Sequence, residues 1–323
     1  MILFKGRFLS FVFLFVFISS GVNARNVSVM AYNAENLFDF MHDEGKDDWT
    51  YMPKSEKVKG SEAFEACKKI SNNYYRIQCF TLDWSREVFF KKLENISFMI
   101  RSYNNFSGPD VIVLEEVENI GVLHAMVEYY LGDLGYSIEN VVLIEGPDGR
   151  GIDVGVISRI PLAGSPVLNT VDLTEVGYKR PTRGILEVPL NLGNRILTVL
   201  ANHWPSQGNK VRTRIKAAKV LRSILQRTPS DVLVLAAGDF NTTDNEYSQV
   251  FAENLFNEES GVFFIDAYDQ CVRYGGYYCT EPGAPGGTYY YNKDKKWNRL
   301  DRIFLSNSFL KDVSFSWENF VVY

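Results

Sequence analysis

Five segments of the chain combine a strand-like run with polar side chains at the end of the run or within it. The apolar run 231–235 is typical of a fully buried strand, and residues 236–241 follow it as Ala-Ala-Gly-Asp-Phe-Asn. The other segments are 26–32 before Asn33, Glu35 and Asn36; 109–114 before Glu115, Glu116 and Glu118; 195–201 before Asn202 and His203; and 299–305, which contains Asp301. Each segment predicts a core strand that carries polar groups to the edge of a sheet.

The repetition of this pattern favours a functional site over a set of unrelated turns. Gly, Asp and Asn all favour turns, so Gly238, Asp239 and Asn241 alone would predict only a strand-ending turn. Burial of a neutral polar group without a partner costs about 2–7 kcal/mol, yet several strands repeat the arrangement. We therefore expect these side chains to meet around a cation and a bound oxyanion.

Helical and irregular segments separate the predicted strands. Apolar residues recur at helical spacing from about residue 85 to 100 and over 211–225, where basic residues occupy the opposite face. We expect the polar segment 39–83 to be a loop-rich insertion. Segment 274–298 is rich in Gly, Pro and aromatic residues, which either stack on substrate bases or pack onto the body of the protein. With no repeat or linker in sight, residues 25–323 predict a single domain.

The first 24 residues have the pattern of an export signal. Lys5 and Arg7 precede a short apolar stretch, 8–18, and Val-Asn-Ala at 22–24 has the form of a cleavage site. The apolar stretch is shorter than the ~20 residues that a membrane-spanning helix needs. We therefore expect cleavage after Ala24, a periplasmic or secreted protein, and no stable membrane insertion.

The net charge does not by itself favour a polyanionic substrate. The chain has 34 basic and 39 acidic residues, and loss of residues 1–24 would leave 32 basic and 39 acidic residues, a net charge of −7. An acidic protein does not attract nucleic acid over long range. Binding of DNA would need a local basic surface or divalent cations that bridge to phosphate.

The four cysteines fall into two local pairs. Cys67 lies near Cys79, and Cys271 lies near Cys279. In an exported protein, an even number of cysteines at short spacing indicates disulfides. A zinc site is disfavoured, because neither pair has the spacing of a zinc knuckle and the chain has few histidines.

Taken in order, the strand-end motifs resemble those of the endonuclease/exonuclease/phosphatase superfamily, which includes the deoxyribonuclease-like enzymes. The matching pieces are 32–38, 114–117, 151–155, 182–184, 202–206, 238–241 and 300–303. The resemblance implies an α/β fold, a four-layered sandwich in which two packed mixed β-sheets are flanked by helices. It also implies a divalent-metal-dependent hydrolase of phosphate esters.

The resemblance further implies which residues hold the metal and activate water. Glu116 matches the metal-binding glutamate, and Asn33 matches the asparagine that supports the metal site. The expected cofactor is Mg²⁺, with Mn²⁺ or Ca²⁺ as alternatives, and a hard cation of this kind prefers oxygen ligands. Glu115 is a competitor by residue type, although strand alternation would place it on the face opposite Glu116. Asp239 matches the aspartate that orients or deprotonates the attacking water.

The resemblance assigns a second set of residues to the phosphate. His203 would stabilise the phosphorane or protonate the leaving oxygen, and Asp153 either orients His203 or is only a strand-end acid. Asn241 would hold a phosphate oxygen as charge builds up. Arg183 and Asn202 complete the expected phosphate-binding set, because a guanidinium group suits phosphate geometry.

Asp301 matches the aspartate that pairs with a catalytic histidine near the C-terminus of family members. Those members finish with a Ser-Asp-His motif on a last core strand, whereas no histidine follows His203 in this chain. We expect a truncated form that lacks the last strand, because residues 319–323 stop within a strand-like run. Loss of the catalytic end is the alternative.

Together, these features predict an exported phosphodiesterase that uses a divalent metal to activate water. The expected reaction is endonucleolytic hydrolysis of DNA, so nucleic acid is the expected partner. The alternatives are a sphingomyelinase-like or other phosphoesterase of the same fold, and a binding protein without catalysis. The sequence leaves the oligomeric state open.

Overall fold

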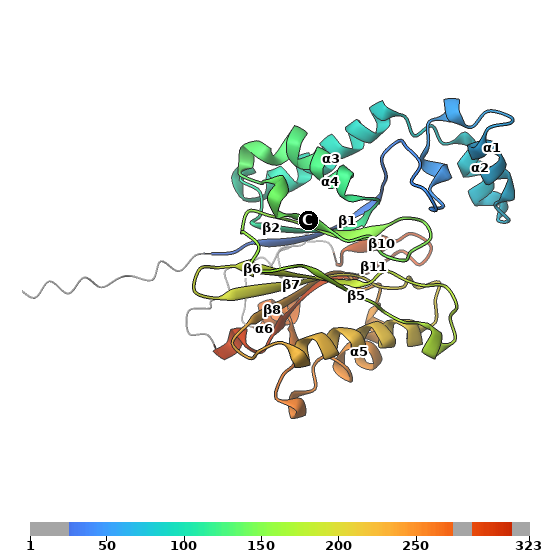
Figure 1. The fold of residues 1–323 in the computed structure, drawn as a ribbon. Helices are drawn as coiled ribbons and strands as arrows, with labels where there is room; N and C mark the ends of the chain where they lie inside the picture. Colours follow the sequence, from blue (N-terminus) through green and yellow to red (C-terminus); the bar gives the residue numbers. More distant parts are fainter. Residues whose placement is uncertain (1–25, 274–285, 312–323) are drawn as a thin grey trace, which may run out of the picture.

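The protein is built from two stacked β-sheets with helices on both outer faces (Figure 1). The computed structural model describes residues 26–273 and 286–311. The expected export signal therefore lies outside the described residues, as do Cys279 and residues 312–323. Helices, sheet, sheet and helices form four layers, so the predicted α/β sandwich is confirmed.

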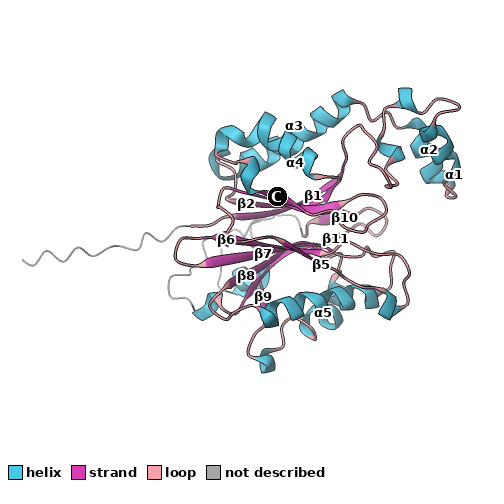
Figure 2. Ribbon diagram, viewed as in Figure 1, coloured by secondary structure: helices cyan, strands magenta, loops and turns pink. Residues whose placement is uncertain are grey.

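The first sheet has the strand order β1-β2-β4-β3. Its strands are β1 (Val29–Leu37), β2 (Val111–Val117), β3 (Val141–Leu143) and β4 (Asp153–Ser158). β1 and β2 are parallel, and the other pairs are antiparallel. α3 (Arg86–Phe106) and α4 (Ile120–Met126) cover the outer face (Figure 2). The predicted first helix is confirmed, and Ser85 caps it by accepting a hydrogen bond from the backbone N–H of Val88.

The second sheet has the order β5-β6-β7-β8-β12-β9. Its strands are β5 (Val167–Asn169), β6 (Ile185–Asn191), β7 (Ile196–His203), β8 (Leu233–Asp239), β9 (Phe264–Asp266) and β12 (Asp301–Ser306). β7 and β8 are parallel, so their carboxyl ends lie side by side. α5 (Val211–Arg227) packs its apolar stripe on the outer face, and α6 (Ala267–Arg273) follows β9. This apolar stripe is the one predicted for residues 211–225.

A third hydrophobic cluster packs between the two sheets. Alternation along β2 sends Val111 and Val113 into this cluster and Ile112 and Leu114 toward the helices. Full burial of such an aliphatic side chain contributes about 1.5–3 kcal/mol each. Packing of both faces therefore fixes the register of the strands whose ends carry the polar residues.

The segment after β1 is more regular than its sequence suggests. It contains two helices, α1 (Glu62–Lys69) and α2 (Asn73–Thr81), where we expected a loop-rich insertion. Both helices are short, and the side chains of Ser61 and Asn72 cap their N-termini. Helices of this length are marginal without tertiary support, so periodicity alone did not reveal them.

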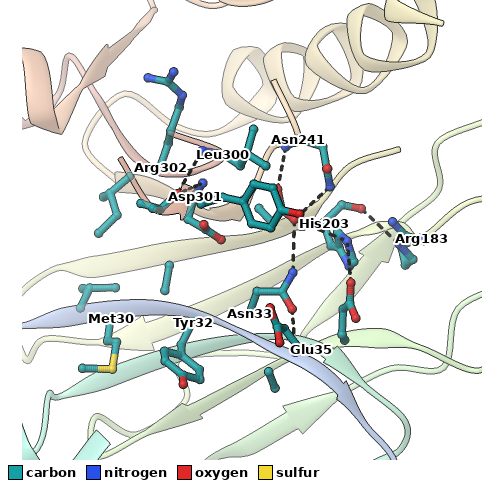
Figure 3. A pocket seen from close by; sticks show the side chains of 18 of the residues that line it. Met30, Tyr32, Asn33, Glu35, Arg183, His203, Asn241, Leu300, Asp301 and Arg302 are labelled. Atoms are coloured by element: carbon teal, nitrogen blue, oxygen red, sulfur yellow. Dashed lines mark hydrogen bonds and ion pairs between the residues drawn. The ribbon is translucent and has the colours of Figure 1, made fainter. Parts of the chain in front are cut away.

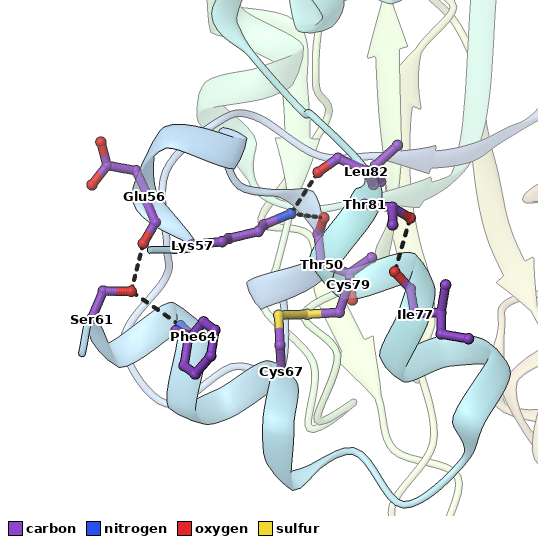
Figure 4. The surroundings of a disulfide bond; sticks show 10 residues. All are labelled: Thr50, Glu56, Lys57, Ser61, Phe64, Cys67, Ile77, Cys79, Thr81 and Leu82. Carbon is purple, nitrogen blue, oxygen red and sulfur yellow. Dashed lines mark hydrogen bonds between the residues drawn. A yellow bond between two sulfur atoms is a disulfide. The ribbon is translucent and has the colours of Figure 1, made fainter. Parts of the chain in front are cut away.

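A disulfide supplies part of that support (Figure 4). Cys67 of α1 is bonded to Cys79 of α2, with 5.5 Å between their Cα atoms. Next to the bond, the Nζ of Lys57 donates to the carbonyls of Thr50 and Leu82. The predicted Cys67–Cys79 pairing is thus confirmed, and the second predicted pair falls outside the described residues because it includes Cys279.

Replacement of both Cys67 and Cys79 with alanine should lower the free energy of unfolding by roughly 2–4 kcal/mol, because the bond restricts the unfolded chain. Urea unfolding followed by circular dichroism measures the change. Wild-type protein under reducing conditions should lose at least as much, because Cys271 is also disulfide-bonded. An unchanged unfolding midpoint in both samples would contradict a structural role for this bond.

The rest of the described chain adds a small hairpin and no candidate for a bilayer span. β10 (Tyr289–Tyr291) and β11 (Lys296–Asn298) pair in antiparallel fashion within the predicted irregular segment. Across residues 26–273 and 286–311, no helix has both the length and the apolar character needed to cross a membrane.

Candidate active site

A cleft of about 2780 Å³ lies between the two sheets and opens where the polar strand ends meet. Parallel pairing brings the carboxyl ends of β1 and β2 together in one sheet and those of β7 and β8 together in the other. β12 runs antiparallel to β8, so its first residue, Asp301, faces Asp239. Six predicted site residues line the cleft at this end: Asn33, Glu116, His203, Asp239, Asn241 and Asp301.

Asp239 is held by amide groups from both sheets. Its Oδ1 accepts a 2.7 Å hydrogen bond from the backbone N–H of Asn241, and its Oδ2 accepts from the Nδ2 of Asn241 at 2.9 Å. The Nδ2 of Asn33, on the opposite sheet, donates to the same Oδ2 at 3.2 Å. Figure 3 shows Asn33 pointing across the cleft toward Asn241 and His203. These donors fix the orientation of the carboxylate.

His203 lies at the end of β7, directly beside Asp239 in register. Its Nε2 is 3.8 Å from Oε1 of Glu116 and 3.8 Å from Oδ2 of Asp239. Burial lowers the pKa of His203 well below its usual value, and the charges of Arg183 and Arg150 lower it further. His203 is therefore neutral at physiological pH, which makes it a hydrogen-bond donor or acceptor and not a cation.

A β-bulge at Glu116 changes the expected alternation of the two glutamates. The register with β4 shifts between Glu115 and Val117, and Glu116 has a left-handed φ of 60°. Glu115 continues the face between the sheets, while the bulge turns Glu116 toward His203. Glu115 keeps the alternation of β2 and does not line the cleft, whereas the alternation breaks at Glu116.

Glu115 is fully buried and faces the acids of the second sheet. Neither of its carboxylate oxygens has a hydrogen-bond partner in the described part of the chain. Burial raises its pKa well above the usual value, and Asp301 and Asp239 raise it further. The protein therefore carries an acid that is protonated, or needs a nearby cation, at the centre of the site.

Asp239 and Asp301 share this excess of negative charge. Burial raises the pKa of Asp239 to about 7, and the charge of Asp301 adds to the shift. Burial also raises the pKa of Asp301, whose Oδ1 has no partner among the described residues. A divalent cation next to these oxygens would stabilise their ionised forms.

Gly238 allows the two sheets to approach at this point. Its φ is +132°, and a Cβ atom here would lie 2.0 Å from the carbonyl oxygen of Asn202 and 2.8 Å from Oε1 of Glu115. No other residue type fits without displacement of the neighbouring backbone. The glycine that precedes Asp239 is therefore required by the packing of the site.

Three predicted site residues are engaged elsewhere. Asn202 is fully buried, donates to the carbonyl of Leu200 and accepts from the indole N–H of Trp204, so it shapes the end of β7 and does not line the cleft. Arg183 lines the cleft, but its Nη1 binds Asp148 at 3.0 Å and its Nε and Nη2 donate to the carbonyls of His203 and Trp204.

Asp153 is the third of these residues. Its Oδ1 accepts a hydrogen bond from the backbone N–H of Gly146, and burial raises its pKa to about 6. Of the two alternatives for Asp153, a contact with His203 is not formed, because within the described residues Nδ1 of His203 has no partner. Asp153 faces the loop that precedes β4 and holds it in place.

Most basic residues along the cleft were missed because they belong to no motif; Arg180 alone was considered, as a weaker alternative to Arg183. Arg150, Lys179 and Arg180 are exposed and line the cleft, and Lys92 reaches it from α3. Tyr289 and Tyr291 of the hairpin also line it. Their only sequence signal is the presence of basic and aromatic side chains in irregular segments.

The site fits a hard cation with few protein ligands. In the described ranges, no group of three or more His, Cys, Asp or Glu side chains already surrounds one point. Mg²⁺ commonly binds one or two carboxylates and completes its shell with water and substrate phosphate. Glu116 lines the cleft together with Asp239 and Asp301, and can supply the single carboxylate that such a cation requires.

Comparison with known proteins places the chain in a family. Solved structures with similar folds include D. rerio TDP2 complexed with single strand DNA product (20% identity, TM-score 0.47, 66% of this chain and 77% of that chain). They also include a beta hairpin deletion mutant of beta toxin from Staphylococcus aureus (12%, 0.49, 92% and 91%) and a protein of the endonuclease/exonuclease/phosphatase family from Leptotrichia buccalis (20%, 0.47, 69% and 83%).

A search of curated proteins found no match. A sequence model of one family, in contrast, matches residues 69–321, most of the chain. The chain belongs to the endonuclease/exonuclease/phosphatase family, whose members are mostly hydrolases of phosphate esters and generally depend on divalent metals.

Proposed function

We propose that the protein is an exported, Mg²⁺-dependent phosphodiesterase that cleaves DNA as an endonuclease. The observation that carries this proposal is the meeting of Glu116, His203 and Asp239 at one end of the cleft, with 3.8 Å from the imidazole to each carboxylate. At this spacing, Glu116 could hold a cation, Asp239 could activate water and the imidazole of His203 could face the phosphate.

Glu116 would hold the cation, and Asn33 would support it from the facing strand. When bound, Mg²⁺ neutralises charge on the phosphate and helps to orient it. Asn33 is well suited to a supporting role, because its Nδ2 donates to Asp239 while its Oδ1 accepts from the backbone N–H of Glu35. The asparagine thereby couples the metal side of the site to Asp239.

Asp239 would accept the proton of the attacking water. A general base works best when its pKa lies near the working pH, and burial raises the pKa of this carboxyl to about 7. The side-chain amides of Asn33 and Asn241 both donate to Oδ2 of this carboxylate. A water can therefore donate to the carboxylate from only a few directions. Burial is the main cause of the raised pKa of Asp239, and the charges of Asp301 and Glu116 add to it.

Neutral His203 would donate an N–H to the phosphate oxygen that gains charge. Its lowered pKa disfavours the other role that we considered, protonation of the leaving oxygen. Asn241 would add a second donor by exchanging one of the two hydrogen bonds that its Nδ2 makes, to Asp239 and to the carbonyl of Trp204, for one to the phosphate. Preorganised donors of this kind stabilise developing charge without reorganisation.

The basic and aromatic residues that line the cleft support DNA as the substrate. Arg150, Lys179 and Arg180 are exposed there and offer local positive charge on an otherwise acidic protein. Tyr289 and Tyr291 offer faces on which unpaired bases can stack. These side chains take the place that sequence analysis gave to Arg183, which is held by Asp148.

Export is supported by the N-terminal pattern and by the Cys67–Cys79 bond. Disulfides persist in oxidising compartments such as the periplasm and the extracellular space.

The proposed base predicts a rate that rises with pH. Below about pH 7 the rate of diester hydrolysis should increase about tenfold per pH unit, because only ionised Asp239 accepts a proton. Mg²⁺ favours the ionised carboxylate, so the midpoint should lie at or below about 7 and fall further as Mg²⁺ is raised. A rate–pH profile at two Mg²⁺ concentrations measures this. A rate that falls with rising pH over this range would contradict the assignment.

A substrate comparison tests the proposed function. The purified protein is incubated with supercoiled plasmid or with sphingomyelin vesicles, each with Mg²⁺ or with EDTA. Nicking of plasmid that requires Mg²⁺, without release of phosphocholine, supports the endonuclease. Hydrolysis of sphingomyelin alone would support the lipid phosphodiesterase, and a folded protein inactive on both would support a binding protein.

A further inference from the structure

A second group of acids lies outside the cleft. Asp39, Asp43 and Asp48 belong to the segment after β1, and Glu118 follows the end of β2. None of these four residues, which we call the acid cluster, lines the cleft. Asp48 and Glu118 are each 1% exposed, so this is an interior arrangement and not a solvated run of charges.

Glu118 is the centre of the acid cluster. Its Oε2 accepts a 2.6 Å hydrogen bond from the backbone N–H of Asp39. Its Oε1 is buried and has no hydrogen-bond partner in the described part of the chain. The charges of Asp39, Asp43 and Asp48 all act on this carboxyl. A buried carboxylate oxygen without a hydrogen-bond partner therefore lies beside three further acids.

Backbone and amide groups hold the cluster, and cations do not. The N–H of Met41 donates to Asp39 at 2.6 Å, and the N–H of Asp43 donates to Asp48 at 2.7 Å. Asn119, the N-cap of α4, donates its Nδ2 to Asp43 at 3.1 Å. No lysine or arginine of the described residues forms an ion pair with these acids; only the imidazole of His42 contacts Asp48.

The nearby lysines are used elsewhere. Lys46 binds Glu145 and the carbonyl of Gly146, and Lys57 donates to the carbonyls of Thr50 and Leu82. Buried carboxylates are stable when they are paired or bind a metal. The acid cluster lacks a paired cation among the described residues, so binding of a metal is the remaining way to stabilise its ionised form.

We propose that the acid cluster binds a divalent cation, Ca²⁺ in preference to Mg²⁺ or Zn²⁺, at a site separate from the cleft. Several carboxylates on an irregular segment suit the flexible, all-oxygen coordination of Ca²⁺. Zn²⁺ would need thiolate or free imidazole ligands, and the His42 imidazole faces Asp48. The side chains do not yet surround one point, so the cation draws Glu118 Oε1 and the partly exposed Asp39 and Asp43 together.

Occupancy of this site would brace one wall of the cleft. The N–H of Asp47 donates to the carbonyl of Gly149 at 2.8 Å, and Nζ of Lys46 donates to the carbonyl of Gly146 at 3.3 Å. The loop that carries these carbonyls also carries Asp148, which binds Arg183, and Arg150, which lines the cleft. A cation at the acid cluster therefore orders residues 39–48 and, through them, this loop.

Terbium luminescence tests the proposal without reference to activity. The ring of Trp49 stacks on His42, with 3.5 Å between the ring centroids, and so lies beside the cluster. The test uses full-length protein with Glu116→Gln, which removes the metal ligand proposed in the cleft. Excitation of indole should give Tb³⁺ emission that Ca²⁺ displaces at lower concentration than Mg²⁺. Trp49→Phe should lose most of the emission but keep a rise in Tm with Ca²⁺.

Glu118→Gln should weaken Tb³⁺ and Ca²⁺ binding roughly 10–100-fold, as loss of a group that holds a metal usually does. Asp43→Asn, at a partly exposed position, should weaken binding in the same direction and decides the matter if Glu118→Gln does not fold by circular dichroism. Glu94→Gln, an exposed acid of α3, is the matched control and should bind as wild type. The proposal is overturned if no emission is displaced by Ca²⁺, or if both cluster variants bind as tightly as the control.

Discussion

Replacement of Asp239 with asparagine should lower kcat for a simple phosphodiester such as bis(p-nitrophenyl) phosphate by about 10³-fold or more, because the general base and its charge are both lost. Asparagine keeps the size of the side chain, so substrate access is unchanged. The effect should be large because Asp239 is the carboxylate that Asn33 and Asn241 jointly orient. Steady-state kinetics with saturating Mg²⁺ measures it.

The Asp239→Asn variant must remain folded for this result to count. Far-UV circular dichroism and Tm should stay near those of wild type, because the change also removes one charge from a crowded group of acids. Asn241→Asp would be a poor comparison, since it adds an acid to that group. A folded Asp239→Asn variant that keeps a tenth or more of wild-type kcat would rule out Asp239 as the base.

Replacement of Glu116 with glutamine should have the second large effect, mainly on the metal. The apparent affinity for Mg²⁺ in the hydrolysis assay should fall about 10–100-fold, and activity at low Mg²⁺ should be lost. The reason is that Glu116 is the acid that the bulge at φ 60° turns toward His203 at the mouth of the cleft. Titration of activity with Mg²⁺ separates this from a loss of kcat.

Glu35→Gln is the matched control for Glu116→Gln. Glu35 is an exposed acid that lines the same cleft, and its side chain makes no hydrogen bond with Asn33, which contacts only its backbone N–H. Its Mg²⁺ dependence should match wild type. If Glu35→Gln shifted the Mg²⁺ requirement and Glu116→Gln did not, the assignment of the metal ligand would be reversed.

The strand ends were predictable from sequence because runs of apolar residues predict buried strands. The runs before Asn33, His203 and Asp239 correspond to β1, β7 and β8, and parallel pairing then brings their ends together. Helix α5 was predictable for the same reason, since its apolar stripe packs on the second sheet. Four layers follow once two sheets each have one face for helices and one for each other.

The geometry within the site was less predictable, because it depends on local irregularities and on partners distant in sequence. Nothing in Leu114-Glu115-Glu116-Val117 indicates the bulge that turns Glu116 into the cleft. The partner of Arg183 is Asp148, a loop residue outside every motif, and the partner of Asp153 is a backbone N–H. A motif shows which residue type is present. Whether the side chain of that residue is free to bind a substrate depends on the hydrogen bonds that it makes in the folded protein.

Nicking of supercoiled plasmid by the purified protein, with Mg²⁺ or EDTA and beside Asp239→Asn, tests the central claim most directly. We predict nicked circles that appear with Mg²⁺, disappear with EDTA and are absent with the variant. Nicking that persists in EDTA or in a folded Asp239→Asn protein, or no nicking by folded wild type at any Mg²⁺ concentration, would contradict a metal-dependent endonuclease centred on Asp239.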